Sequence, residues 1–321
     1  MLGKKGYPVE AIEDGRCIGL DVEAGEIDRL CIYLNGALTG LETVDTNALF
    51  LESRTVPDFG DIADVRPLNR FIAFNASDWL GDLIDSGRID SLFQPIFRIP
   101  ESGAPTEVFA HECLARGRDA ENRPVAPGFM FSTAVDADLL FPLDRAARAA
   151  AVRNAAAAGI ETNIFINFTP SSVYDPANCL RNTVTVVEDS GLPRDRFVFE
   201  VVESEQVRDV EHLAGILAFY RRNGFRVALD DVGAGYASLN MLPTLKPDFV
   251  KIDRELVSGI DHDPAKPVIV RGLCDIAREL GIGVIAEGIE TEAELEGVRL
   301  AGADYAQGYH LARPSDAPWR G

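Results

Sequence analysis

The chain has few of the features that mark secreted, membrane-bound or zinc-binding proteins. No apolar stretch reaches the roughly 18 residues of a membrane span, and residues 1–10 have no apolar core of a signal peptide. The five cysteines lie far apart without a Cys-x-x-Cys pair, so neither a disulfide framework nor a thiolate zinc site is expected. We therefore expect a cytoplasmic protein with free thiols and no membrane span.

Positive charge is also scarce. The chain has 31 Lys and Arg residues against 51 Asp and Glu residues, which gives a formal net charge of −20. Extended nucleic acids bind to clusters of Lys and Arg, so we do not expect such a partner. An anionic ligand would need local compensation of this negative charge, and divalent cations held by carboxylates supply it.

What the chain does contain is eight short apolar runs with polar or charged residues near their ends. Several runs are rich in Val, Ile and Phe, as buried strands are, and helical stretches alternate with them from the third run onward. This alternation predicts parallel strands, and eight of them suffice to close a barrel whose reactive groups gather at the C-terminal strand ends. The runs cover residues 91–99, 107–116, 163–168, 197–202, 226–231, 248–252, 283–287 and 304–308.

The connections define the architecture further. Only residues 100–106 join the first two runs, too few for the dozen or more residues of a parallel crossover, so these runs must form an antiparallel hairpin. A chain of 321 residues can hold a barrel of about 250 residues and a small additional segment. We predict an α/β fold in which residues 77–321 form a TIM-like (β/α)8 barrel with one antiparallel strand, after an N-terminal segment (1–76) of unknown role.

Helix signals support this arrangement. Ser77 can cap a helix over residues 79–84 that leads into the first strand. Thr291 and Glu294 form a capping box at the start of the last helix. Another helix is indicated by apolar residues that share one face, namely Leu213, Ile216, Leu217 and Tyr220.

Oxygen-bearing side chains stand at the ends of five of the runs. They are Glu112, Asn167, Glu200, Asp230, Asp231 and Glu287. Oxygen ligands suit Mg²⁺ or Mn²⁺ better than zinc, and the four histidines show no ligand spacing. So many neighbouring carboxylates would raise one another's pKa unless metals offset their charge. We therefore predict two metal ions and a bridging water activated for in-line attack on phosphorus.

Two features of this set are difficult to explain as purely structural. A single acidic residue at a strand end often caps a helix or lies in solvent. Asp230 and Asp231, however, are adjacent where a buried strand meets a turn that contains Gly233. Lys251 lies inside an apolar run and would be costly to bury unpaired, so it requires a partner carboxylate, either Asp253 or the metal cluster.

In this order, the motifs resemble those of the EAL domain, a family of barrel phosphodiesterases that cleave the bacterial messenger cyclic di-GMP. The resemblance runs from about residue 79 to residue 314, nearly three quarters of the chain. The matching motifs are Gln94-Pro95-Ile96, Glu112-Cys113-Leu114 in place of Glu-Ala-Leu, Asn167, Glu200 with Glu203, Asp230 to Leu239, Lys251-Ile252-Asp253, Ala286-Glu287-Gly288 and Gln307-Gly308-Tyr309.

The resemblance implies a role for each matching position. One Mg²⁺ or Mn²⁺ ion would be held by Glu112, Asn167, Glu200 and Asp230. A second would be held with the help of Asp231 and Glu287. Lys251 would orient or activate the attacking water, with Glu287 the other candidate base, and Glu203 would brace the loop after Asp231. Contacts to the nucleotide would come from Gln94, Leu114, Arg116, Asp253 and Gln307.

The loop after the two aspartates departs from the family pattern. Val232 and Ala234 stand where the pattern has Phe and Thr, so the loop lacks an aromatic ring and a hydroxyl that help to hold it in relatives. In many relatives this loop also takes part in a dimer contact. We expect a more mobile loop that depends more on Glu203, and a homodimer, since relatives commonly dimerise.

Three functions fit these residues. The first is metal-dependent hydrolysis of cyclic di-GMP to linear 5′-pGpG, which we favour because every catalytic position is retained. The second is a catalytically weak or inactive cyclic di-GMP receptor that signals through the N-terminal segment, which would predict missing metal ligands. The third is a carbon–oxygen lyase of the enolase kind, which explains the carboxylates and Lys251 but not Asn167, Gln94 or Arg116.

Overall fold

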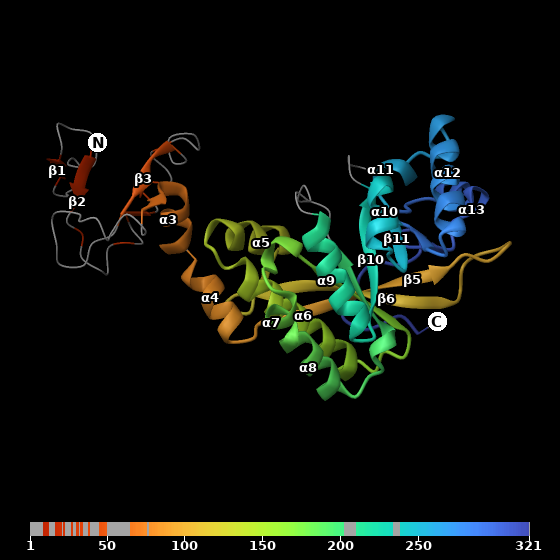
Figure 1. Cartoon of the computed structure of the whole chain (residues 1–321), viewed down its shortest axis with the longest axis horizontal. Coiled ribbons are helices and arrows are strands. Elements are labelled where there is room, and N and C mark those ends of the chain that lie inside the picture. Colours follow the sequence, from red (N-terminus) through yellow and green to blue (C-terminus); the bar gives the residue numbers. More distant parts are fainter. Residues whose placement is uncertain are drawn as a thin grey trace. The chain divides into compact units, whose positions relative to one another are not determined.

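The chain divides into two compact units, whose elements are labelled in Figure 1. One unit comprises residues 1–86 and 119–140, and the other comprises residues 87–118 and 141–321. A computed structural model describes residues 9–12, 17–20, 22, 27, 30, 31, 33, 34, 38, 45–49, 65–75, 77–201, 210–233 and 238–320.

The first unit contains short antiparallel strand pairs and small helices. Strand β1 (Val9–Ile12) pairs with β2 (Cys17–Leu20), and β3 (Asn47–Ala48) pairs with β4 (Arg66–Pro67). Its other elements are α3 (Leu68–Asn75), α4 (Asp78–Asp85), β7 (Pro124–Val125) and α5 (Pro127–Asp136). Ser77 precedes α4 as predicted, but its side chain makes no capping hydrogen bond to that helix. A small core is formed by Leu30, Cys31, Leu34, Leu68 and Ile72.

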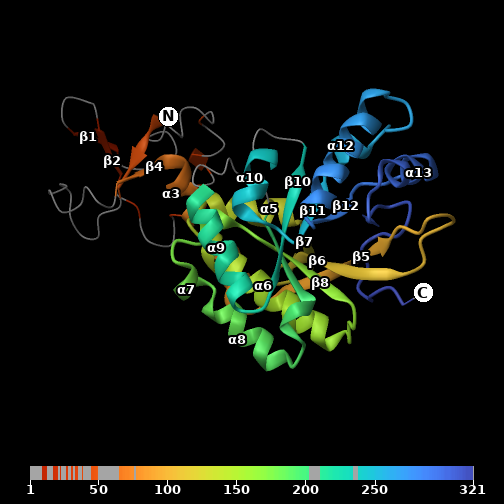
Figure 2. The same ribbon diagram turned by 45° about the vertical axis from the view of Figure 1, so that its right-hand side comes forward.

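Eight strands of the second unit form a closed barrel, which Figures 1 and 2 show from two directions. Their order around the barrel is β5-β13-β12-β11-β10-β9-β8-β6, and pairing of β5 with β6 closes the ring. The strands are β5 (Ile89–Arg98), β6 (Val108–Arg118), β8 (Asn163–Phe168), β9 (Phe197–Val201), β10 (Arg226–Val232), β11 (Phe249–Ile252), β12 (Gly283–Ala286) and β13 (Tyr305–Ala306).

The predicted antiparallel hairpin is confirmed. Strand β5 runs antiparallel to both of its neighbours, β6 and β13, whereas the other neighbouring strands of the barrel are parallel. Within the hairpin Gln94 pairs with Glu112, which brings two predicted site residues side by side. The barrel therefore has one reversed strand, as the short connection requires.

Helices connect the parallel strands. They are α6 (Leu140–Ala157), α7 (Pro176–Cys179), α8 (Arg181–Ser190), α9 (Val210–Arg222), α10 (Ser238–Leu245), α11 (Arg254–Val257), α12 (Ala265–Glu279) and α13 (Glu292–Ala301), with the 3-10 turns Pro170–Ser172 and Arg194–Arg196. The predicted capping box at the start of α13 and the predicted buried face of α9 are both confirmed. None of the helices in the described part of the chain has the length and apolar character of a membrane span.

The alternation of side chains along the strands determines where the polar residues at the C-terminal end of the barrel lie. An apolar layer inside the barrel takes one residue from each of seven strands, namely Ile96, Ala110, Phe165, Val198, Ala228, Phe249 and Ile285. Side chains two positions apart point to the same face of a strand. The residues two positions further toward the C-terminal end of the barrel are Gln94, Glu112, Asn167, Glu200, Asp230, Lys251 and Glu287. A ring of polar side chains therefore lies directly above the apolar layer.

Candidate active site

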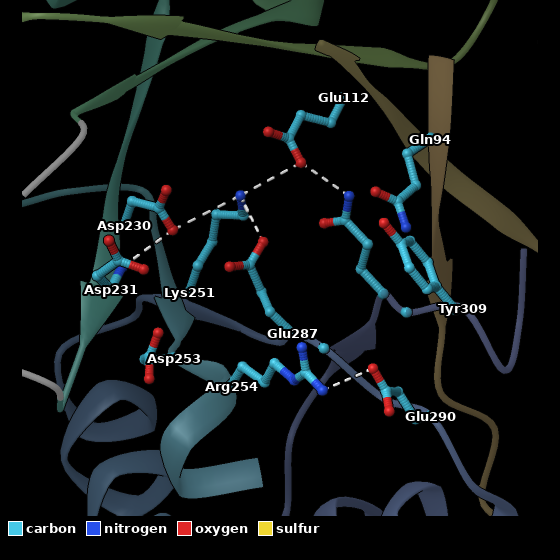
Figure 3. Close-up of a pocket in the computed structure, with 13 residues that line it drawn as sticks. Gln94, Glu112, Asp230, Asp231, Lys251, Asp253, Arg254, Glu287, Glu290 and Tyr309 are labelled. Atoms are coloured by element: carbon cyan, nitrogen blue, oxygen red, sulfur yellow. Dashed lines mark hydrogen bonds and ion pairs between the residues drawn. The ribbon is translucent and has the colours of Figure 1, made fainter. Parts of the chain in front are cut away.

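The polar ring opens into a pocket of about 360 Å³, shown in Figure 3. Eight residues named from the sequence line this pocket: Gln94, Glu112, Asp230, Asp231, Lys251, Asp253, Glu287 and Gln307. They come from strands β5, β6, β10 and β11 and from the segments that follow β11, β12 and β13. These residues are spread over more than two hundred positions of the sequence, and the fold brings them together at one end of the barrel.

Lys251 lies at the centre of the carboxylates, as Figure 3 shows. The residue is 1% exposed. Its Nζ lies 2.5 Å from Glu287 Oε1, 3.4 Å from Glu112 Oε2 and 3.6 Å from Asp230 Oδ1. It also pairs with Glu200, which is completely buried. The partner that Lys251 requires is therefore the carboxylate cluster.

Asp253, the other predicted partner of Lys251, has a different role in the fold. Its carboxylate accepts a hydrogen bond from the backbone N–H of Glu255 at 2.6 Å and caps α11. It still lines the pocket, so it remains placed for contact with a ligand.

Glu112 connects both sides of the polar ring. Asn167 Nδ2 donates to Glu112 Oε1 at 2.8 Å, and Gln307 Nε2 donates to Glu112 Oε2 at 2.7 Å. Gln94 Nε2 donates to the backbone oxygen of Ala312 at 3.3 Å, and this bond holds the Gln94 amide at the pocket wall. The two amides that donate to Glu112 fix the orientation of its carboxylate.

A candidate metal centre lies within this ring. Glu200, Asp230 and Glu287 each offer a carboxylate oxygen, and these oxygens lie within 4.8 Å of one another. Glu200 Oε2 is buried and has no hydrogen-bond partner among the described residues. A buried acceptor of this kind requires a partner, and an oxygen-only donor set fits a hard divalent cation. The residues present therefore fit Mg²⁺ or Mn²⁺.

Electrostatics support the same reading. Burial raises the pKa of Glu200 and of Glu287 well above the ordinary carboxyl value, which Lys251 partly offsets and Asp230 reinforces. Burial acts to lower the pKa of Lys251, but the surrounding carboxylates outweigh it and hold that pKa well above its ordinary value. The cluster has more negative charge than one ammonium neutralises, and additional cations would relieve this excess.

Asp231 lies at the turn that follows the ring. Its φ angle is 53°, a left-handed backbone conformation that is uncommon for a residue other than glycine. Burial, followed by the charges of Asp230 and Asp253, raises the pKa of Asp231 to about 6. Gly233 has a φ angle of 107°, and a Cβ atom there would collide with Leu256. The backbone conformation thus favours glycine here, and a larger residue would also require the end of the Leu256 side chain to move.

Several predicted residues lie outside the pocket lining. Asn167 and Glu200 are below it and reach it through Glu112 and Lys251. Leu114 and Arg116 lie further along β6, where Arg116 Nη1 donates to the backbone oxygen of its neighbour, Ala115, at 2.8 Å. Val232 is 2% exposed at the end of β10. Glu203 and Ala234 lie outside the described residues.

The pocket mouth includes residues that the sequence reasoning did not assign. Arg254 Nη2 lies 2.7 Å from Glu290 Oε1, and both side chains are about half exposed. The stem of Arg254 crosses Gly288, where a Cβ atom would lie 2.5 Å from Arg254 Cγ. Tyr309 also lines the pocket, with the guanidinium of Arg313 4.4 Å from its ring centre. Arg254 directly follows the motif Lys251-Ile252-Asp253, and this position in the sequence could have identified it as a pocket residue.

Comparisons with known proteins agree with this architecture. The sequence profile of the EAL domain matches residues 77–314. The chain is 31% identical over 239 residues to the probable cyclic di-GMP phosphodiesterase PdeG of Escherichia coli (strain K12), a match that covers 72% of this chain and 45% of PdeG. The chain spans less than half the length of the curated relatives that it matches first, with coverage of 45%, 27% and 27%.

Solved structures show the same fold. The standalone versatile EAL protein from Vibrio cholerae O395, in its c-di-GMP-bound form, is 31% identical with a TM-score of 0.64, and the match covers 72% of this chain and 94% of that one. Klebsiella pneumoniae BlrP1, in a manganese and cyclic di-GMP complex, is 28% identical with a TM-score of 0.63, with coverage of 71% and 56%. The chain described here belongs to the EAL domain family.

Proposed function

We propose that this chain hydrolyses cyclic di-GMP to linear 5′-pGpG with the help of two divalent cations, Mg²⁺ or Mn²⁺. The observation that carries the proposal is the set of carboxylates around Lys251, in which a buried Glu200 oxygen lacks a partner among the described residues. The relatives support it, because one is named a probable cyclic di-GMP phosphodiesterase and two were solved with this nucleotide. We also propose that residues 77–321 form the catalytic barrel, that residues 1–76 are a separate segment, and that the protein acts as a homodimer.

The polar ring, together with Asp231, would provide the ligands for both cations. One would be held by Glu112, Asn167, Glu200 and Asp230. The other would be held with Asp231 and Glu287. The chemistry that such cations supply when bound is activation of a water for in-line attack on phosphorus. Their charge would also compensate the negative charge of the pocket, which otherwise repels a phosphodiester.

The protein side chains would then perform three tasks. Lys251 would hold the attacking water or its developing charge, since its Nζ lies among the ring carboxylates. Glu287, whose pKa burial raises, is suited to accept the proton of that water. Arg254, at the pocket mouth, can exchange its ion pair with Glu290 for a phosphate oxygen. Hydrolysis adds the hydroxyl group to phosphorus, breaks the P–O3′ bond and leaves a protonated 3′-oxygen, which gives 5′-pGpG.

Chromatography of the products tests this function. Purified protein is incubated with cyclic di-GMP and Mg²⁺ or Mn²⁺, alongside two variants. Asp230→Ala serves as an inactive control, and Asp248→Asn, which lies just before β11 and contacts the first residues of β10, serves as a matched control. We expect linear 5′-pGpG from the wild type and from Asp248→Asn. Binding of nucleotide and metal without product at micromolar enzyme would refute hydrolysis and favour the receptor function.

A further inference from the structure

A second buried ionic group lies outside the pocket, on α6. Asp144 and Arg148 are one helical turn apart and form an ion pair whose side chains are 3% and 0% exposed. Burial of two charges is costly unless hydrogen bonds satisfy their remaining groups. In an alanine-rich helix such a pair is unexpected, and its other contacts show which parts of the barrel it joins.

Asp144 holds the segment that directly follows β8. Its Oδ1 accepts a hydrogen bond from the backbone N–H of Thr169 at 2.9 Å. Its Oδ2 lies 3.0 Å from Ser172 Oγ, which in turn lies 2.7 Å from the backbone oxygen of Thr169. The carboxylate therefore holds the backbone N–H of Thr169, and the single hydroxyl hydrogen of Ser172 is shared between Asp144 Oδ2 and the backbone oxygen of Thr169.

Arg148 links Asp144 to the neighbouring helix α8. It neutralises Asp144, and its Nε donates to Thr183 Oγ1 on α8 at 3.2 Å. Thr183, Arg148 and Asp144 are all buried, so the connection from α8 to α6 is removed from solvent. Charge–dipole and hydrogen-bond interactions are stronger in such an environment than in water.

The segment held in this way carries a residue of the polar ring. Asn167 lies two positions before Thr169, at the end of β8, and its amide donates to Glu112 at 2.8 Å. The direction of the Asn167 side chain depends on the backbone at the strand end, which Asp144 fixes. We propose that Asp144 is a positioning residue for Asn167, with Arg148 as the counter-charge that allows Asp144 to act while buried. This inference rests on the proposed function only where Asn167 is taken as a metal ligand.

The chain offers a control that separates positioning from general stabilisation. Asp248 also accepts a hydrogen bond from a strand backbone, the N–H of Val227, at 2.9 Å. That bond is at the first residues of β10, the end of the barrel opposite the pocket. Asp144→Asn and Asp248→Asn thus each remove the charge of an aspartate that accepts a hydrogen bond from a backbone N–H near a strand end, one beside the polar ring and one away from it. Ser172→Ala is a milder change that leaves the ion pair intact.

The first measurement is independent of metal. In protein labelled with ¹⁵N at asparagine, the side-chain amide signals of Asn167 are identified by their loss in Asn167→Asp. We expect these signals to shift in metal-free Asp144→Asn and Ser172→Ala but to stay in place in Asp248→Asn. Asn167 signals that superimpose on those of the wild type in both Asp144→Asn and Ser172→Ala would overturn the proposal. If Asp144→Asn does not fold, Ser172→Ala alone decides.

The second measurement is the Mn²⁺ dissociation constant from calorimetry, read beside the melting temperature. Changes to residues that orient a metal ligand typically weaken metal binding about tenfold to a hundredfold. We expect at least a tenfold rise in the dissociation constant for Asp144→Asn, and a value within twofold of wild type for Asp248→Asn even where its melting temperature falls. Equal values for both variants would contradict positioning. A wild type that binds no Mn²⁺ would refute the proposed function, whereas the Asn167 signals would still decide the role of Asp144.

Discussion

Replacement of Lys251 by methionine tests the central contact of the site. Methionine keeps much of the aliphatic length but removes the ammonium that pairs with Glu112, Glu200, Asp230 and Glu287. Lys251 is 1% exposed, so its ammonium is the main compensating charge for these carboxylates in the metal-free protein. The four carboxylates would then face one another without compensation.

The expected loss of stability is large. Removal of one partner from a buried ion pair costs about 3–5 kcal/mol. For a domain of this size, each kcal/mol lowers the melting temperature by about 2–4 °C, so we expect a decrease of roughly 6–20 °C in EDTA. The carboxylates can take up protons instead, so the decrease should be larger at pH 8 than at pH 5. Bound Mn²⁺ would supply the missing charge and reduce the difference.

Calorimetric melts in EDTA and in Mn²⁺, with initial rates on cyclic di-GMP, measure both effects. Lys246→Met is a matched control, because Lys246 is exposed and only five residues away. We expect turnover of Lys251→Met to fall by at least about a hundredfold, with substrate affinity within tenfold of wild type, because a residue that acts on the water contributes mainly in the transition state. A metal-free Lys251→Met that melts within 2 °C of wild type would refute the electrostatic argument, and a large loss of affinity with an unchanged rate constant would assign Lys251 to binding.

Four further outcomes can be checked. Glu112→Ala should remove nearly all turnover in a chromatographic assay, because three site residues bond to this carboxylate; activity within tenfold of wild type would contradict this. Ca²⁺ in place of Mg²⁺ should inhibit, since its longer and looser coordination misplaces the water; full turnover in Ca²⁺ would show the geometric reasoning to be wrong. The metal-free protein should lose stability as the pH rises from about 4 to about 6, because the pKa of Asp231 is raised from 3.8 to about 6 and the native state binds more protons than the unfolded state in that range. Melts of Asp231→Asn should show a shallower pH dependence than wild type, and identical slopes would exclude this residue as the cause. Arg254→Ala should raise KM about tenfold with kcat within threefold, as expected for the loss of one charge-assisted bond at the pocket mouth; an unchanged KM in initial-rate assays would rule out that contact.

Local patterns were enough to predict most of the barrel. The connection over residues 100–106 was too short for a parallel crossover, and β5 and β6 are antiparallel. The predicted strand at 163–168 coincides with β8, because alternation and flanking polar residues define both of its ends. The last strand, predicted over 304–308, is only Tyr305–Ala306, since the residues after it turn into the pocket wall. The same alternation predicted that polar side chains gather at the C-terminal ends of the strands.

Contacts between distant elements were harder to predict. The sequence indicated that Lys251 needs a carboxylate, but local pattern could not distinguish Asp253 from the cluster, because the choice depends on which strand faces which. The buried charges of α6, Asp144 and Arg148, carry no signal of their burial in the local sequence. The pairing of Arg254 with Glu290 likewise depends on the approach of two loops that follow different strands.

The reversed strand also has a consequence for synthesis on the ribosome. One edge of β5 pairs with β6 soon after it emerges, but the other pairs with β13, where Phe97 meets Ala306 more than 200 residues later. Until then β5 presents an open edge with the apolar residues Phe93, Ile96 and Phe97, the type of surface on which nascent chains associate with one another. Closure depends on a β13 of only two residues, supplemented by the bridge between Phe93 and Ser315. The barrel can thus close only once its shortest strand, β13, is available to pair with β5, and β5 keeps an open edge until then.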